Sequence, residues 1–224
     1  MNSIEIKNLT KTFGKHKVLD NVSLTVPQKQ IIGLVGINGS GKTMLMRCIC
    51  GFVIPEKGEI VVNGTTIGEK NNFAKDIGII IEMPGFLPVY SGITNLSILA
   101  SYSGKKSKEE LALLMKKVGL DPEDKRPVRK YSMGMRQRLG IAQAIMDNPS
   151  LLVLDEPFNG LDKKGVEEIR KLLINLRAEG KTMILTSHHS EDIRSLCDCV
   201  YEMDGGQIVS KYEADEWDKK EEKE

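Results

Sequence analysis

The sequence predicts an α/β fold in which a mixed core sheet carries an antiparallel β subdomain and an inserted helical subdomain. Three observations predict it. The first third of the chain shows short strands with little helix between them, the middle is helical, and the last third alternates buried strands with helices. Alternating strands and helices are typical of parallel sheets with helical crossovers. The last third is therefore expected to supply parallel core strands.

Short strands and turns account for the first third of the chain. The segments SIEIKNLTKTF, VLDNVSLTV and QIIGLVG are predicted strands, and GEIVVNGTTI is a predicted hairpin that turns at Asn63 and Gly64. We expect these early strands to be antiparallel. One helix is expected among them, from Lys42 to about Cys50, and Gly51 would close it.

Helical periodicity fills the middle of the chain. The segment SKEELALLMKKVGL opens with Ser107 and Glu110 at the spacing of a capping box, and it is expected to end at Gly119. A further helix is predicted from about Gly134 to Met146. Because this region interrupts the strand pattern, we expect residues 90–147, approximately, to form a subdomain inserted between two halves of the sheet.

The last third returns to strands. LLVLD and TMILTS are predicted buried strands with a helix at Lys163–Arg177 between them, and a short helix at Glu191–Leu196 precedes the strand VYEMD. The sequence contains no internal repeat, so one domain is expected over residues 1–212. Residues 213–224 are almost all charged, and we expect a frayed or disordered C-terminal tail in which Trp217 is isolated.

Composition and charge exclude several classes of protein. The formal net charge is +1, which gives no electrostatic case for nucleic acid or an anionic membrane as a partner. No apolar run is long enough to span a bilayer, and the N-terminus lacks the pattern of a secretory signal. We therefore expect a cytoplasmic protein that reaches a membrane only through a partner.

The four cysteines form two C-x-C pairs, Cys48 with Cys50 and Cys197 with Cys199. A zinc site built from both pairs is one interpretation, although zinc ligands are usually spaced C-x2-4-C. Residues two apart on a helix also point to different faces. Buried reduced thiols are the favoured interpretation.

The segment GINGSGKT fits the pattern G-x-x-x-x-G-K-[ST] between a predicted strand and a predicted helix, which is the context that a phosphate-binding loop requires. Backbone N–H groups and the helix N-terminus would hold a phosphate chain. Lys42 would reach the outer phosphates and the Thr43 hydroxyl would bind Mg²⁺. A glycine-rich turn is the alternative. The predicted nucleotide-binding residues are Gly36, Ile37, Asn38, Gly39, Ser40, Gly41, Lys42 and Thr43.

The segment LLVLDEP places two carboxylates at the C-terminal end of a buried strand, where α/β sheets bind ligands. Asp155 would hold Mg²⁺, through water, and Glu156 would orient or deprotonate the attacking water. A strand that ends in surface acids is the alternative. Because a phosphate-binding loop precedes these acids, the functional interpretation is favoured.

A phosphate-binding loop and an acidic strand end could also belong to a kinase, a GTPase or a motor. Three further segments distinguish among these classes: YSMGMRQRLGIAQAI before the acidic strand, NGLD after it, and LTSHHSED at the end of the next strand. In this order they resemble the nucleotide-binding subunit of ABC transporters, and the resemblance covers almost the whole chain. The family's usual signature is L-S-G-G-Q, and YSMGM occupies its place. Ser132 and Gly134 match it, whereas Tyr131, Met133 and Met135 depart from its commonest form.

The resemblance implies the P-loop ABC ATPase fold and a head-to-tail dimer in which two subunits enclose each ATP. The signature residues Ser132 and Gly134 of one subunit would close over the P-loop of the other, with Asp162 across the interface. Asp162 is also a candidate helix N-cap. His188 matches the switch histidine that contacts the γ-phosphate, and Phe13 matches the aromatic residue that stacks on adenine. Alone, these two would be a strand-end histidine and a core aromatic.

Glu82, in the segment GIIIEMPGF, occupies the place where ABC subunits usually carry a glutamine that senses Mg²⁺ and abuts the permease. A glutamate there, followed by proline and an aromatic residue, resembles the subgroup that exports antimicrobial peptides, with lantibiotic-immunity and bacitracin-resistance transporters among its members. We expect Glu82 to point at the Mg²⁺–phosphate site and to bind Mg²⁺ or the attacking water. The cation there would offset the cost of burying the carboxylate. The segment Pro84–Pro88 would lie near the permease.

The predicted function is that of an ATP-hydrolysing subunit that drives a separate membrane permease, from the cytoplasmic side of the cell membrane. The expected catalytic residues are Lys42, Glu156 and His188, and the expected Mg²⁺ ligands are Thr43, Glu82 and Asp155. Two alternatives stay open: a soluble ABC-type ATPase acting on ribosomes or DNA, and a nucleotide-binding regulator that does not hydrolyse ATP. The transported substrate and the choice between a homodimer and a heterodimer stay undetermined by the sequence.

Overall fold

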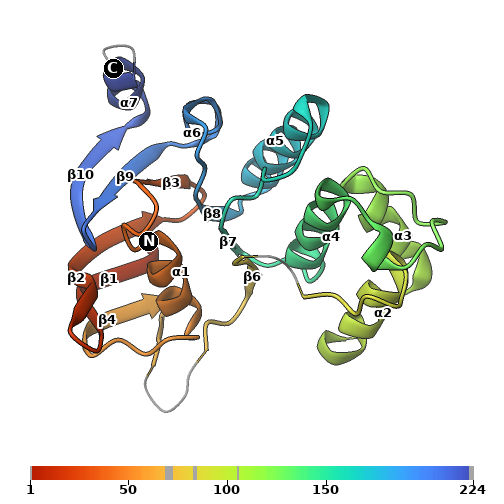
Figure 1. Ribbon diagram of the computed structural model, residues 1–224, viewed down its shortest axis with the longest axis horizontal. Coiled ribbons are helices and arrows are strands. Elements are labelled where there is room, and N and C mark those ends of the chain that lie inside the picture. The colour runs from red at the N-terminus through yellow and green to blue at the C-terminus, as the bar shows by residue number, and fades with distance from the viewer. Residues whose placement is uncertain (1, 69–72, 83–84, 105, 222–224) are drawn as a thin grey trace.

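The computed structural model describes residues 2–68, 73–82, 85–104 and 106–221. In this part of the chain the smaller of two sheets has four antiparallel strands, and its order is β2-β1-β4-β5 (Figure 1). Val62 pairs with Thr65 across Asn63 and Gly64, so the predicted hairpin is confirmed. These strands are β1 (Asn2–Phe13), β2 (His16–Pro27), β4 (Lys57–Val62) and β5 (Thr65–Thr66).

The larger sheet has six strands among the described residues, in the order β10-β9-β3-β8-β7-β6, and only β10 is antiparallel to its neighbour. The parallel strands predicted in the last third are therefore confirmed. The expectation that all early strands are antiparallel is wrong for β3, because its five residues are buried on both faces and pair with strands from the last third. The six are β3 (Ile31–Val35), β6 (Ile77–Ile80), β7 (Leu151–Leu154), β8 (Thr182–Leu185), β9 (Cys199–Asp204) and β10 (Gln207–Glu213).

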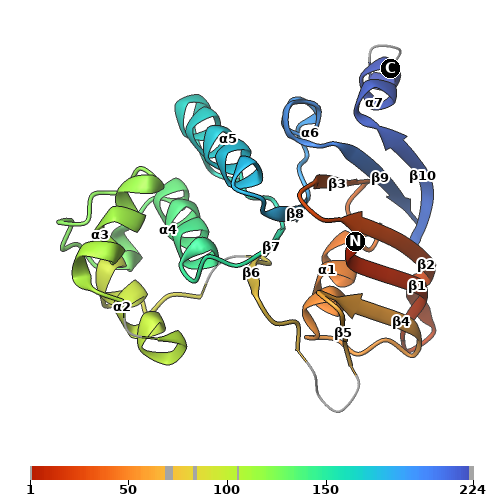
Figure 2. The same ribbon diagram turned by 180° about the vertical axis from the view of Figure 1, so that it is seen from behind.

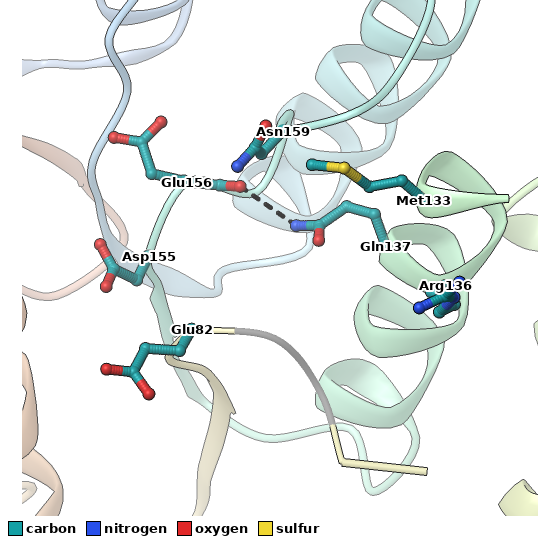
Figure 3. Close-up of a pocket in the computed structure, with 7 residues that line it drawn as sticks. All are labelled: Glu82, Met133, Arg136, Gln137, Asp155, Glu156 and Asn159. Atoms are coloured by element: carbon teal, nitrogen blue, oxygen red, sulfur yellow. Dashed lines mark hydrogen bonds between the residues drawn. The ribbon is translucent and has the colours of Figure 1, made fainter. Parts of the chain in front are cut away.

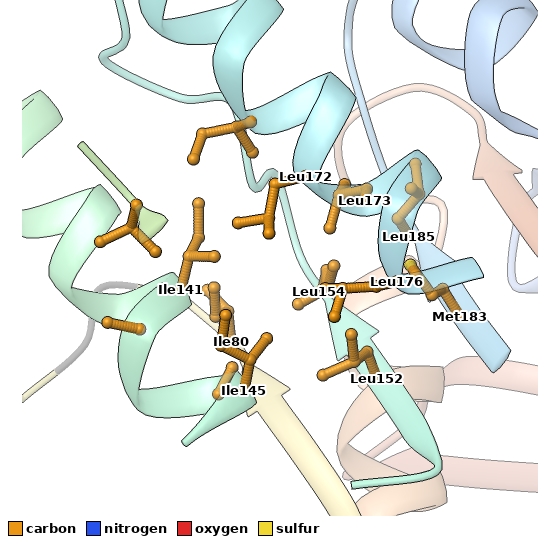
Figure 4. Packing of buried hydrophobic residues seen from close by; sticks show 14 of the residues in the cluster. Ile80, Ile141, Ile145, Leu152, Leu154, Leu172, Leu173, Leu176, Met183 and Leu185 are labelled. Atoms are coloured by element: carbon orange, nitrogen blue, oxygen red, sulfur yellow. The ribbon is translucent and has the colours of Figure 1, made fainter. Parts of the chain in front are cut away.

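Successive residues of the core strands feed two hydrophobic clusters on opposite faces of the sheet. Leu151 and Val153 of β7 join the cluster shared with the smaller sheet and α1 (Lys42–Cys50). Leu152 and Leu154 join the cluster shared with α4 (Met133–Ile145) and α5 (Lys163–Ala178), as Figure 4 shows. This alternation follows from the two-residue period of a strand. The core sheet is therefore covered on both faces.

Helices α2 (Gly92–Ser103), α3 (Lys108–Lys117) and α4 follow β6 and precede β7, with the short 3-10 helix η2 (Val128–Lys130) before α4. They lie on the side of the molecule away from the smaller sheet in both views (Figures 1 and 2). The predicted capping box of Ser107 and Glu110 is present. Helix α1 has the predicted bounds, and Gly51 closes it in a left-handed conformation.

Gly78 of β6 explains how closely α4 approaches the sheet edge. A Cβ atom at Gly78 would lie 2.0 Å from the Ala144 carbonyl oxygen of α4. No side chain fits at this distance without moving the helix backbone. The glycine that opens the segment GIIIEMPGF is therefore a packing requirement.

The C-terminal segment is ordered as far as the structure describes it, so the expectation of a disordered tail is wrong there. Strand β10 runs through Glu213, and α7 (Ala214–Glu221) follows it. Trp217 is 5% exposed, packs on the ring of Tyr212 with centroids 5.6 Å apart, and belongs to the cluster that includes α6 (Ser190–Leu196). Burial of one large aromatic ring anchors an otherwise charged helix. Residues 222–224 lie outside the described part.

The cysteines are buried thiols. Cys48 and Cys50 lie in α1, Cys197 follows α6, and Cys199 is the first residue of β9. Among the described residues no cluster of three or more His, Cys, Asp or Glu side chains could hold a metal ion. The structure therefore agrees with buried reduced thiols and gives no support to the zinc interpretation.

Candidate active site

The loop of residues 36–43 joins β3 to α1 and depends on glycine at its closest approach to the sheet. Gly36 has φ 142°, and a Cβ there would lie 2.1 Å from the Met203 carbonyl oxygen. Gly41, at φ 106°, is the N-cap of α1 and provides no side-chain cap. The first N–H groups of α1 are thus left to bind an anion at the positive end of the helix.

The Lys42 side chain folds back over this loop. Its ammonium donates hydrogen bonds to the carbonyl oxygens of Gly36 at 2.6 Å and Ile37 at 3.0 Å. Burial lowers the pKa of Lys42, and the nearby carboxylates of Glu156 and Asp155 oppose that shift. Ser40 Oγ is buried and has no hydrogen-bond partner in the described part of the chain. A charged donor and a buried hydroxyl without a partner fit a phosphate group at this loop.

Asp155 follows β7 and is held by two threonines. Its Oδ2 accepts a hydrogen bond from Thr43 Oγ1, and its Oδ1 accepts one from Thr186 Oγ1, each at 2.8 Å. The Thr43 hydroxyl and the Asp155 carboxylate are oxygen ligands of the kind that Mg²⁺ prefers, and they meet beside the loop. This donor set fits the ion that the sequence predicts.

Glu156 lies next to Asp155 in a left-handed conformation, φ 50°. Its N–H donates to Thr186 Oγ1 at 2.8 Å, and its carbonyl accepts from Gln137 Nε2 at 3.1 Å. His188 Nε2 lies 3.3 Å from Glu156 Oε1. Burial raises the pKa of the Glu156 carboxyl, and His188 opposes that shift. The backbone of Glu156 is therefore fixed on both sides while its carboxylate faces the histidine.

Neither of the two residues that fix the backbone of Glu156 was predicted from the sequence. Gln137 lies in the segment YSMGMRQ, and Thr186 directly precedes Ser187. A polar residue at the end of the strand next to LLVLD was the available signal for Thr186, because adjacent parallel strands end at the same edge of a sheet. Gln137 offered no signal beyond its place three residues after Gly134.

Glu82 follows β6 by two residues and meets a cation from the protein itself. Its carboxylate forms an ion pair with Arg47 of α1, and its side chain is 62% exposed. The expectation that burial of Glu82 must be offset is therefore wrong, because solvent reaches the carboxylate. Glu82 lines a cleft together with Asp155 and Glu156 (Figure 3). Met83 and Pro84 lie outside the described residues.

The signature residues lie apart from the loop. Ser132 caps α4, with its Oγ accepting a hydrogen bond from Met135 N at 3.2 Å, and Gly134 approaches the Gly160 carbonyl so closely that a Cβ would lie 2.8 Å from it. Asp162 caps α5 by accepting from Gly165 N, as predicted. Ser132, Gly134 and Asp162 line one cleft, whereas Lys42, Thr43, Asp155, Glu156 and His188 line another.

Phe13 ends β1 and is exposed, with the Lys11 ammonium 5.2 Å from the centre of its ring. An exposed aromatic ring is available for stacking. In the described segments, no helix combines the length and the apolar character that crossing a membrane would need.

Comparison with known proteins gives the same family throughout. The family described as ABC transporter matches residues 19–159. An uncharacterized ABC transporter ATP-binding protein of Bacillus subtilis, YybJ, is 44% identical, with 92% of this chain and 94% of that protein covered. The lantibiotic transport ATP-binding protein SrtF of Streptococcus pyogenes is 36% identical over 95% of this chain and 91% of its own length. The bacitracin transport ATP-binding protein BcrA of Enterococcus faecalis is 40% identical, with 97% of this chain and 71% of that protein covered.

Solved structures agree on the fold. An ATP-binding subunit of an ABC transporter superimposes with a TM-score of 0.86 at 25% identity and covers 95% of this chain and 90% of that one. The dimeric ATP-binding cassette MJ0796, bound to ADP and phosphate, gives a TM-score of 0.85 at 22% identity. The match covers 94% of this chain and 98% of that one. With the phosphate-binding loop, the paired acids and the histidine in one cleft, the chain belongs to the ABC transporter family, as an ATP-binding subunit that hydrolyses ATP to drive transport.

Proposed function

We propose that this subunit drives a separate permease that exports an antimicrobial peptide or another small compound, and so confers resistance or immunity. The names of the relatives SrtF and BcrA support a lantibiotic or bacitracin-like substrate. The observation that carries the ATPase assignment is the convergence of Lys42, Thr43, Asp155, Glu156 and His188 on one cleft. The proposed site of action is the cytoplasmic face of the cell membrane, reached through the permease.

The contacts of each of these residues support a separate role for it in ATP hydrolysis. The Lys42 ammonium would leave the Gly36 and Ile37 carbonyls to contact the outer phosphates. Thr43 and Asp155 would hold Mg²⁺, which stabilises the charge that develops on the transferred phosphoryl group. Glu156, fixed at its backbone, would orient or deprotonate the attacking water. Burial raises the pKa of Glu156, which makes its carboxylate a stronger base.

A second subunit would complete each site. Ser132 and Gly134 lie at the N-terminus of α4, where a helix binds anions, yet they line a cleft separate from the loop that holds Lys42. In a head-to-tail dimer, this surface of one subunit would close over the loop of the other. Asp162, which shares the cleft with Ser132, would then face the partner's loop, and Phe13 would stack on the adenine.

The surface near Glu82 is proposed to contact the permease. Arg47, the partner of Glu82, lies in the last turn of α1, and exposed apolar side chains follow both α1 and Glu82 along the chain. These side chains are Phe52, Ile54, Leu87, Val89 and Tyr90. Glu82 lines the same cleft as the acids Asp155 and Glu156, so a change at Mg²⁺ would reach the permease through it.

The Glu156→Gln variant tests the ATPase assignment. The amide keeps the shape of the side chain but accepts no proton, so the variant should bind ATP, lose turnover and accumulate as a dimer on size-exclusion chromatography with ATP. Lys42→Ala should weaken ATP binding instead. Turnover near the wild-type rate in Glu156→Gln would refute the role of Glu156.

The transport assignment has its own test. The permease that co-purifies with the chain from membranes is identified and expressed with it, and survival in bacitracin or a lantibiotic is measured. Wild type should raise survival and Glu156→Gln should not. If Glu82→Gln and Glu82→Ala both leave the ATPase rate, its Mg²⁺ dependence and transport unchanged, the proposed role of Glu82 is wrong.

A further inference from the structure

A buried ion pair lies behind the Ser187–His188 segment. Asp192, in the first turn of α6, is 1% exposed. Its Oδ2 accepts a hydrogen bond from Ser187 Oγ at 2.9 Å, and its Oδ1 accepts one from Arg170 Nη2 at 2.7 Å. A carboxylate so far removed from water is stable only where charged or hydrogen-bonding partners meet both oxygens.

Ser187 connects this pair to the active site. Its hydroxyl donates to Asp192 and accepts from the His189 N–H at 3.1 Å. His188 lies between these two anchored residues, and its side chain is 53% exposed toward the cleft where it meets Glu156. One buried carboxylate, acting through one hydroxyl, thus fixes the backbone on both sides of His188.

Arg170 connects the same carboxylate to α5. That helix begins at Asp162, which caps it, and Arg170 lies eight positions further on, about 12 Å along the helix at its usual rise. We treat helix α5 as a rigid element that moves as one unit. Any shift of Asp162 that accompanies contact with a partner subunit would therefore reach Asp192, and through it Ser187 and His188.

We propose that Asp192 is a positioning residue of the ATPase site. Through Ser187 it holds His188 over Glu156, and through Arg170 it joins the Ser187–His188 segment to α5. The proposal rests on the functions proposed for His188, Glu156 and Asp162. It adds a connection within one subunit between the interface residue and the histidine that meets the reacting phosphate.

Two variants and one control test it. Asp192→Asn keeps the shape but removes the charge, and Ser187→Ala removes the bridging hydroxyl while the Arg170–Asp192 pair remains. Glu191→Gln is the control, because Glu191 is the neighbour of Asp192 and also pairs with Arg170, at 3.3 Å, but is 80% exposed. Each variant is assayed for kcat and KM with Mg-ATP, for affinity for a fluorescent ADP analogue, and for melting temperature.

The two variants should lower kcat by about 10- to 100-fold, the effect of a misplaced catalytic group. KM and the affinity for the ADP analogue should stay within about twofold, because the loop of residues 36–43 is untouched. The double variant should be no worse than the more severe single variant, since both break the same connection. Glu191→Gln should keep the wild-type kcat.

A folded Ser187→Ala or Asp192→Asn protein with wild-type kcat would overturn the proposal. An equal loss in Glu191→Gln, or an ADP affinity that falls in step with kcat, would overturn it as well, because general disruption would then explain the effect. If Asp192→Asn does not fold, Ser187→Ala decides. Failure of the role proposed for Glu156 is separate: it would appear as undiminished turnover in Glu156→Gln, whatever the variants at Ser187 and Asp192 do.

Discussion

Thr186 is predicted to be the residue on which both acids of the site depend. It is fully buried directly after β8, and its hydroxyl donates to Asp155 Oδ1 and accepts from Glu156 N, each at 2.8 Å. Thr186→Val removes this hydroxyl with little change of volume. Each buried group left unpaired costs about 1–3 kcal/mol. Asp155 keeps its bond to Thr43, so the combined cost should be about 2–4 kcal/mol.

That loss should lower the melting temperature by about 5–15 °C for a chain of this length, measured by differential scanning calorimetry. It should also lower kcat by about 10- to 100-fold, because Glu156 loses the bond that fixes its backbone. Thr186→Ser, which keeps the hydroxyl, should retain most of the activity.

The chain offers a matched control at the other end of the same strand. Thr182 is also buried, and its hydroxyl accepts from Lys29 N at 2.9 Å and from Ser3 Oγ at 3.2 Å, far from the acids. Thr182→Val should therefore lower the melting temperature by a similar amount and leave kcat unchanged. Wild-type kcat in Thr186→Val, or an equal loss of kcat in Thr182→Val, would refute the reasoning.

Three further predictions concern the fold. Trp217→Ala should destabilise the chain by about 3–5 kcal/mol, the cost of emptying a buried aromatic site, and an unchanged calorimetric melting temperature would contradict the anchoring of α7. Gly78→Ala should lower that temperature too, because the added Cβ meets the Ala144 carbonyl at 2.0 Å, whereas tolerance would show that α4 can move. Burial raises the pKa of Cys48 to about 11 and of Cys50 to about 12. Since the folded thiols hold their protons more tightly than unfolded ones, this contribution to stability is complete below about pH 8.5 and is lost as pH rises through about 11 and 12. Chemical denaturation over that range measures it, and iodoacetamide should label these thiols much faster after unfolding.

The local patterns of the sequence determined the site motifs and the approximate bounds of helices α1, α3, α4 and α5. The loop that ends in Lys42 and Thr43, the acids after LLVLD and the caps at Ser107 and Asp162 are each specified by residues within a few positions of one another. Such features depend on backbone conformation and short-range hydrogen bonds, which neighbouring residues dictate. The helical middle and the alternating last third followed from periodicity for the same reason.

Tertiary structure alone decided which side chains meet. Thr43 and Asp155 are 112 positions apart, and the sequence does not show that Arg47 pairs with Glu82 or that Thr186 bridges two acids. Trp217 looked isolated in the sequence because its partners come from α6 and from β10, and the local pattern did not predict that strand. Burial and pairing are properties of the packed chain, since they depend on which distant elements exclude water from a side chain. The sequence therefore identified the chemical groups of the site, and packing determined how they are held.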